Sequence, residues 1–158
     1  RLEDTPNINV TVVTQNVDNL HERAGSRHVL HMHGELCKVR CTQCSTIHLW
    51  SDDCTQETAC PACGAVPALR PHIVWFGEIP FYMDEIETLL YECDLFVSVG
   101  TSGTVYPAAG FVNAVNAYGR AHTVLINLDS HDGISAFAET RQGRAGDLLP
   151  HFVEEIIR

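Results

Sequence analysis

Basic side chains are scarce in this 158-residue sequence, which has 10 lysines and arginines against 20 aspartates and glutamates and a formal net charge of −10. Proteins that bind the nucleic-acid backbone need a basic face, so this balance argues against nucleic acid as the main partner. The sequence also lacks any apolar run near eighteen residues and any secretory leader pattern. We therefore expect neither a membrane span nor a membrane partner, and a cytoplasmic location.

The seven cysteines are an odd number, and without a secretory signal they predict metal-bound or free thiols instead of a disulfide framework. Two C-x-x-C pairs, Cys41 with Cys44 and Cys60 with Cys63, are separated by fifteen residues, a spacing typical of zinc ribbons. Four thiolates fill a tetrahedral shell and leave no position for an activated water, so the pattern predicts one structural Zn²⁺. A redox dithiol or free thiols are the less favoured alternatives.

Apolar strands alternate with helical patterns along the chain. The expected strands are 9–15, 29–36, 68–80, 95–99 and 122–129, and the expected helices are 18–25, 83–94, 106–119 and 151–158. Such alternation predicts an α/β fold, a Rossmann-like parallel sheet with helices on both faces. The cysteine segment interrupts this pattern. We therefore expect a zinc-ribbon module at 41–66 inserted into a Rossmann-like domain formed by 1–40 and 67–158.

Polar residues follow three of the expected strands, at the carboxyl ends where open parallel sheets bind ligands. They are Gln15, Asn16 and Asp18 after the first, Gly100, Thr101 and Ser102 after the second, and Asn127 and Asp129 after the third. A single polar turn is usually only a cap or a turn. Three of them at the ends of successive strands predict a nucleotide or dinucleotide site.

His33 is the histidine with the strongest case for catalysis among the nine in the chain. Most histidines are surface or satisfied core residues, so any one of them is a weak candidate. His33 gains weight because Gly34 follows it and lets another group approach closely, and because it lies shortly before the cysteine segment. An imidazole is mostly neutral yet basic at pH 7, as a general base requires.

Taken together, these motifs resemble the sirtuins, the NAD-dependent protein lysine deacylases. The motifs that carry the resemblance occur in the family's order, and their residues are similar to those of the bacterial branch. They are TQNVDNLHERAG, MHGEL, CTQC with CPAC, LRPHIVWFGE, VGTSGTVYPAAGF and INLD. The resemblance implies NAD as cofactor and an acyl-lysine protein or peptide as substrate. In that family the acyl oxygen attacks the nicotinamide ribose and nicotinamide leaves, and the products are lysine and an O-acyl-ADP-ribose.

The resemblance also implies a role for each matching residue, with His33 as the general base and the zinc ribbon as a brace for the NAD-binding domain. The residues implied to contact NAD are Gln15, Asn16, Val17 and Asp18 at the nicotinamide and its ribose, Gly100, Thr101 and Ser102 at the phosphate and ribose portion, Asn127, Leu128 and Asp129 at the adenosine ribose, and Ala145 at the adenine. The residues implied to receive the substrate peptide as an added strand are Val74, Trp75, Phe76, Gly77 and Glu78.

One part of the family pattern does not occur in this sequence. Sirtuins begin with a strand and a glycine-rich GAGxS-type loop for the NAD phosphates, whereas no G-x-G motif opens this chain. We therefore expect an incomplete Rossmann-like domain, as in a fragment, the ordered part of a longer protein or a natural truncation. The alternative hypothesis is a catalytically inactive, truncated zinc-ribbon module that binds peptides, although the intact His33 and QNVD favour the enzyme.

Overall fold

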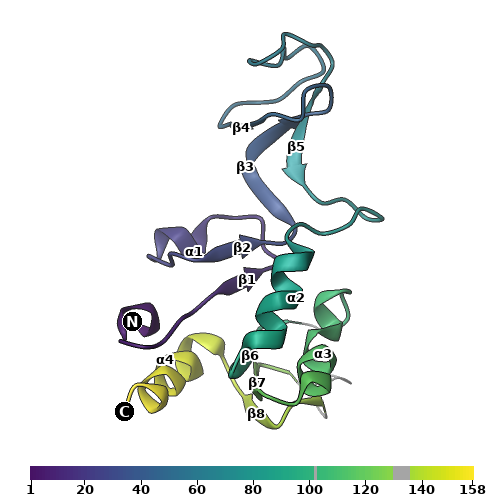
Figure 1. The fold of residues 1–158 in the computed structure, drawn as a ribbon. Coiled ribbons are helices and arrows are strands. Elements are labelled where there is room, and N and C mark those ends of the chain that lie inside the picture. The colour runs from purple at the N-terminus through teal and green to yellow at the C-terminus, as the bar shows by residue number, and fades with distance from the viewer. Residues whose placement is uncertain (102, 130–135) are drawn as a thin grey trace. The chain divides into compact units, whose positions relative to one another are not determined.

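The computed structural model describes residues 1–101, 103–129 and 136–158 (Figure 1). The chain divides into two compact units, one of residues Asn9–Met83 and one that joins Arg1–Ile8 to Asp84–Arg158. Within the described residues, no helix combines the length and the apolarity that a membrane span requires.

The unit of residues 9–83 contains a parallel strand pair and an antiparallel sheet. Its elements are β1 (Val12–Thr14), α1 (Leu20–Arg23), β2 (Val29–His31), β3 (Gly34–Cys41), β4 (Ile47–Leu49) and β5 (Leu69–Ile73). β1 and β2 pair in parallel, and β3 lies between β4 and β5 in the antiparallel sheet. Because Cys41 pairs with Leu69 in the β3–β5 register, the two strands close the base of the cysteine segment.

The cysteine segment has a very small core. Cys41 and Cys60 are each 2% exposed and cluster with the buried Ala68, against which Ala65 and Leu69 pack. A core of this size buries too little apolar surface to hold a segment together without a disulfide or a metal. The packing therefore agrees with the metal site that the cysteine spacing predicts.

The second unit is built on a three-stranded parallel sheet in the order β6–β7–β8. Its elements are η1 (Leu2–Asp4), α2 (Met83–Glu92), β6 (Leu95–Val99), η2 (Ala108–Gly110), α3 (Phe111–Tyr118), β7 (His122–Asn127), β8 (Glu139–Gln142) and α4 (Ala145–Ile156). The central strand β7 is apolar without alternation and its residues 123–126 are at most 1% exposed, as expected for a strand covered on both faces. Phe152 of α4 packs against Val124 and Ile126 of this strand.

The expected α/β class with parallel strands is confirmed, but two expected strands differ in detail. The expected strand 68–80 stops at Ile73, and residues 75–78 form a turn in which Glu78 N–H donates to the oxygen of Trp75 at 2.9 Å. The expected strand 29–36 is broken by a turn at 32–33, because Gly34 takes a positive φ of 86° and begins β3 in a new direction. β3 and β5 then pair antiparallel, outside the parallel sheet.

The C-terminal part also contains more structure than the sequence predicts. β8 was not expected, since its sequence ETRQ has no apolar pattern. The last helix was expected at 151–158 and instead begins at Ala145. The early start brings Leu148, Phe152 and Ile156 onto one face at four-residue spacing, and this face packs on β7.

Candidate functional site

His33 lies in the turn between β2 and β3 and connects two of the segments that the sequence singles out. Its Nδ1 lies 3.1 Å from the backbone oxygen of Gln15, the first of the polar residues that follow β1. A carbonyl oxygen only accepts, so Nδ1 is the donor and Nε2 of the neutral ring keeps a free lone pair. The backbone oxygen of His33 in turn accepts the N–H of Val74 at 2.9 Å. The candidate base is thus fixed between the predicted nicotinamide segment and the predicted peptide segment.

Gly34 makes this turn possible. A Cβ built at this position would lie 2.1 Å from the backbone oxygen of His72 and 2.8 Å from Cα of Ile73, both in β5. The expectation that Gly34 permits a close approach is confirmed, and the approaching group is the backbone of β5.

His31 is a buried neighbour of the candidate base to which sequence reasoning gave no role. Its side chain is 5% exposed, and its Nδ1 lies 3.2 Å from the backbone oxygen of Asn16 while its Nε2 lies 2.6 Å from Oε1 of Glu22 in α1. The hydrogen bond from His31 lowers the pKa of Glu22 below its ordinary value. His31 and His33 therefore contact two successive carbonyls of the QNVD segment. The H-x-H spacing was the sequence signal that could have indicated this pair.

The rest of the QNVD segment is held mainly through its backbone. The oxygen of Val17 accepts the N–H of Leu36 at 2.8 Å, which ties the segment to β3. Asp18 accepts the N–H of Leu20 through Oδ1 at 3.0 Å and so begins α1 in the manner of an Asx turn. The exposed Asn16 and the half-buried Gln15 complete the group of polar residues that follows β1, beside His33.

The other predicted NAD residues gather at the carboxyl edge of the β6–β7–β8 sheet. Asn127 donates through Nδ2 to the backbone oxygen of Thr101 at 3.0 Å. This hydrogen bond connects the carboxyl end of β7 to the turn that follows β6. Gly100 N–H donates to the oxygen of Ile126 at 3.0 Å, and Gly143 N–H donates to that of Asn127 at 2.9 Å. Leu128 and Asp129 follow β7 and are exposed, Ala145 opens α4 after β8, and Ser102 lies outside the described residues. This edge is where open α/β sheets bind ligands. It belongs to the second unit, whereas the QNVD segment and His33 belong to the first.

The four predicted metal ligands form one cluster, in which all Sγ atoms lie within 4.8 Å of one another. The distances are 3.7 Å between Cys41 and Cys63 and 3.8 Å between Cys44 and Cys60. A regular tetrahedron with Zn–S bonds of about 2.3 Å has S–S edges of about 3.8 Å. The cysteines are therefore positioned to hold a zinc ion.

The protonation of the cluster supports the same conclusion. Burial opposes the thiolate of Cys60, but N–H donors from the backbone of Cys63 and Ala62 and a contact with His48 outweigh it and lower its pKa to about 6. Cys63 has a backbone donor at Ala65, yet burial and the neighbouring cysteines raise its pKa to about 12. Four thiolates this close repel one another unless a cation is present, so full deprotonation accompanies metal binding.

The predicted peptide segment forms a turn closed by Glu78. Its carboxylate accepts two hydrogen bonds from Arg70, at 2.6 Å and 3.2 Å, and one from the N–H of Trp75 at 3.0 Å. The bonds from Arg70 and then from Trp75 hold the pKa of Glu78 below its usual range. The Arg70 guanidinium also lies 5.6 Å from the centre of the Trp75 ring. Phe76 at the tip of the turn is fully exposed.

Sequence reasoning did not single out Arg70, which makes most of these contacts, or Arg40, whose Nη2 lies 3.5 Å from Oε2 of Glu78. Arg70 belongs to the quoted motif LRPHIVWFGE, eight residues before Glu78. A basic and an acidic residue within one motif were the sequence signal that could have indicated this contact.

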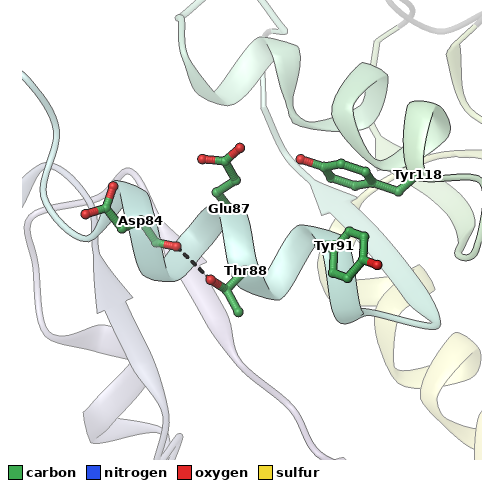
Figure 2. Close-up of a pocket in the computed structure, with 5 residues that line it drawn as sticks. All are labelled: Asp84, Glu87, Thr88, Tyr91 and Tyr118. Carbon is green, nitrogen blue, oxygen red and sulfur yellow. Dashed lines mark hydrogen bonds between the residues drawn. The ribbon is translucent and has the colours of Figure 1, made fainter.

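A shallow pocket of about 320 Å³ lies elsewhere, between α2 and α3 (Figure 2). It is lined by Asp84, Glu87, Thr88, Tyr91 and Tyr118. Tyr91 and Tyr118 meet edge to face with ring centres 5.2 Å apart, and Thr88 donates to the backbone oxygen of Asp84 at 3.0 Å. No predicted site residue lines this pocket, so it is separate from the candidate site.

Comparisons with known proteins agree with the sequence motifs and the fold. The Sir2 family model matches residues 1–107. An NAD-dependent protein deacylase of Pasteurella multocida is 52% identical over 149 residues, which are 94% of this chain and 63% of that protein. A Sir2 homologue solved as a complex with NAD is 34% identical with a TM-score of 0.83, over 94% of this chain and 59% of that one. A Sir2 structure with a p53 peptide and NAD⁺ is 27% identical with a TM-score of 0.78, over 92% of this chain and 62% of that one.

The chain therefore spans about 60% of the length of the relatives that it matches. Over that length the sequence identity and the structural similarity agree, and the resemblance indicated by the motifs is confirmed. This chain belongs to the Sir2 family.

Proposed function

We propose that this chain carries out the NAD-dependent removal of acyl groups from protein lysines, with His33 as the general base. The observation that carries the proposal is the hydrogen bond from His33 Nδ1 to the oxygen of Gln15. It favours the tautomer in which Nε2 keeps its lone pair, and the residue is only half-buried. The Pasteurella relative, named as an NAD-dependent deacylase, supports the same activity.

The polar residues that follow β1, β6 and β7 suit NAD by their chemistry, and the backbone after β6 has open space beside it. A Cβ at Gly100 would meet no atom within 4 Å, so a ligand can approach this backbone closely. NAD, when bound, supplies the ribose carbon from which nicotinamide leaves and which accepts the acyl group. The residues proposed to hold it are Gln15, Asn16, Val17 and Asp18 at the nicotinamide and its ribose, Gly100, Thr101 and Ser102 at the phosphate and ribose portion, Asn127, Leu128 and Asp129 at the adenosine ribose, and Ala145 at the adenine.

We further propose that residues Val74 to Glu78 receive the substrate peptide and that Phe76 helps to enclose the acyl-lysine. Val74 donates its N–H to the oxygen of His33, so a peptide bound along this segment would place its lysine near the base. The fully exposed Phe76 offers an apolar surface to the lysine stem. The p53 peptide and NAD⁺ in a structural neighbour support this class of substrate.

The zinc module is proposed to comprise residues 41–66, as an insertion between the two parts of the Rossmann-like domain. All seven cysteines are thiols without disulfides, which supports a reducing, cytoplasmic setting. In this arrangement the metal stabilises the module and takes no part in the reaction, because its shell is complete with four sulfurs.

The proposal is tested by nicotinamide release from NAD with an acetyl-lysine peptide. We expect release by the chain extended with the part of the Pasteurella relative that it does not match, since this chain spans 63% of that protein. His33→Ala should reduce the rate by about 10²–10⁴-fold, the usual contribution of a general base. His151→Ala, at an exposed position of α4, is the matched control and should keep the full rate. Release that persists in His33→Ala would remove His33 from this role. NAD binding without any release would favour the inactive peptide-binding module.

A further inference from the structure

The cysteine segment is unusual in its charge. Residues 41–66 contain Asp52, Asp53 and Glu57 but no lysine or arginine, and His48 is the one basic side chain in the segment. Zinc bound by four thiolates carries a net charge of −2, since each ligand cysteine is deprotonated. The segment itself therefore offers a single side chain that can place positive charge beside the metal site.

The structure places this side chain at the cluster. His48 lies in β4 opposite Val39 of β3 and is half-buried. Its Nε2 lies 3.7 Å from Sγ of Cys60, a distance suited to an N–H donor and a sulfur acceptor. Two residues earlier, Oγ1 of Thr46 lies 3.3 Å from Sγ of Cys44. The strand and the turn before it thus direct two polar side chains toward thiolates of different C-x-x-C pairs.

We propose that His48 is a hydrogen-bond partner of the zinc thiolates, which donates from Nε2 to Cys60 and thereby strengthens retention of the metal. The four sulfurs are close enough together to fill a zinc shell on their own, so in this proposal the ring contacts a ligand sulfur and does not bind the ion. A donor lowers the electron density on the thiolate and offsets part of the site's negative charge. Partners of this kind also fix the orientation of a ligand, and their loss typically weakens metal affinity.

The experiment compares His48→Met with His48→Gln in the full 158-residue chain. The two replacements are similar in length, but only glutamine keeps an N–H near the position of Nε2. Zinc affinity is measured by competition with a chromophoric chelator, without any need for catalytic activity. We expect His48→Met to bind zinc about 10–100-fold more weakly and His48→Gln to stay within a few-fold of the wild type. His151→Met, at an exposed position of α4, should not change the affinity.

Three results would overturn the proposal. The first is wild-type affinity in His48→Met, and the second is equal loss in both variants, which would indicate packing of the imidazole instead of hydrogen bonding. The third comes from Co²⁺ in place of zinc, because an absorption spectrum of a three-sulfur, one-nitrogen site would make His48 a direct ligand. A four-sulfur spectrum in the wild type, with a shifted sulfur-to-cobalt band in His48→Met but not in His48→Gln, is the expected result.

Discussion

His31 Nε2 lies 2.6 Å from Oε1 of Glu22, while the opposite ring nitrogen lies 3.2 Å from the backbone oxygen of Asn16. Both partners are acceptors, so the ring makes both hydrogen bonds only in its doubly protonated form. The pair fastens α1 to the polar exit of β1. His33 donates to the adjacent carbonyl of Gln15, so the same short backbone segment holds the half-buried His31–Glu22 pair and the candidate base.

Replacing Glu22 with glutamine should reduce stability near neutral pH but not in acid. Because His31 lowers the pKa of Glu22 from 4.5, the carboxylate stabilises the fold above this value and loses its effect as pH falls through the lowered pKa. The carboxylate is 42% exposed, so we expect a difference of at most about 1 kcal/mol. Unfolding of wild type and Glu22→Gln from pH 7 to pH 3 tests this, with Glu87→Gln as an exposed control. A difference that does not shrink in acid would contradict it.

Replacing Gly34 with alanine should unfold or severely weaken the unit of residues 9–83. The new Cβ would lie 2.1 Å from the oxygen of His72 at a φ of +86°. Backbone strain and overpacking together predict a loss on the order of 3 kcal/mol. Gly25→Ala is the matched control, since Gly25 has a φ of +95° but no atom within 4 Å of its Cβ. It should cost about 1–2 kcal/mol from strain alone. Equal losses in chemical denaturation would show that the close approach does not matter.

The parts of the site that could be predicted from sequence are those with local signals. The strands β6 and β7 are continuous apolar runs, and the polar residues after them mark the edge where Thr101 and Asn127 meet. The four cysteines were predicted by spacing alone, because a C-x-x-C turn brings its two sulfurs together without help from the rest of the fold.

The parts that could not be predicted depend on contacts between distant residues. Residues 75–78 read as a continuation of β5, because IVWF is apolar and extended by propensity. The turn forms there because the Glu78 carboxylate meets Arg70, eight residues away, and Arg40, thirty-eight residues away. β8 likewise forms by pairing with β7, with no pattern of its own.

Replacing Cys60 with serine should remove the zinc and weaken the fold together. Cys60 is 2% exposed and contributes one of the four sulfurs of the cluster, so a hydroxyl there leaves an incomplete shell in a very small core. We expect zinc content well below one ion per chain and a lower unfolding temperature. Cys37→Ser is the control, because Cys37 is an exposed thiol of β3 outside the cluster. One zinc per chain in Cys60→Ser would show that the ligand set is wrong.

Replacing Arg70 should weaken peptide binding more than it slows the chemical step. Arg70 makes a two-bond contact with Glu78 and lies over the Trp75 ring, so it holds the turn that exposes Phe76. Without it, the turn must be ordered when the peptide binds, and that cost raises the peptide KM. We expect Arg70→Ala to raise this KM by about tenfold in the extended enzyme, with kcat changed less. Arg70→Lys should restore little, because an ammonium cannot make the planar two-bond contact.

The same turn gives a matched test at its acidic partner. Glu78→Gln keeps the shape of the side chain and can still accept from the N–H of Trp75, but it loses the charge that Arg70 pairs with. We expect its peptide KM to lie between those of the wild type and Arg70→Ala. The double variant should be no worse than Arg70→Ala alone, because both changes remove one interaction. Fully additive effects in this double-mutant cycle would show that Arg70 and Glu78 act on the peptide separately and do not act together through the turn.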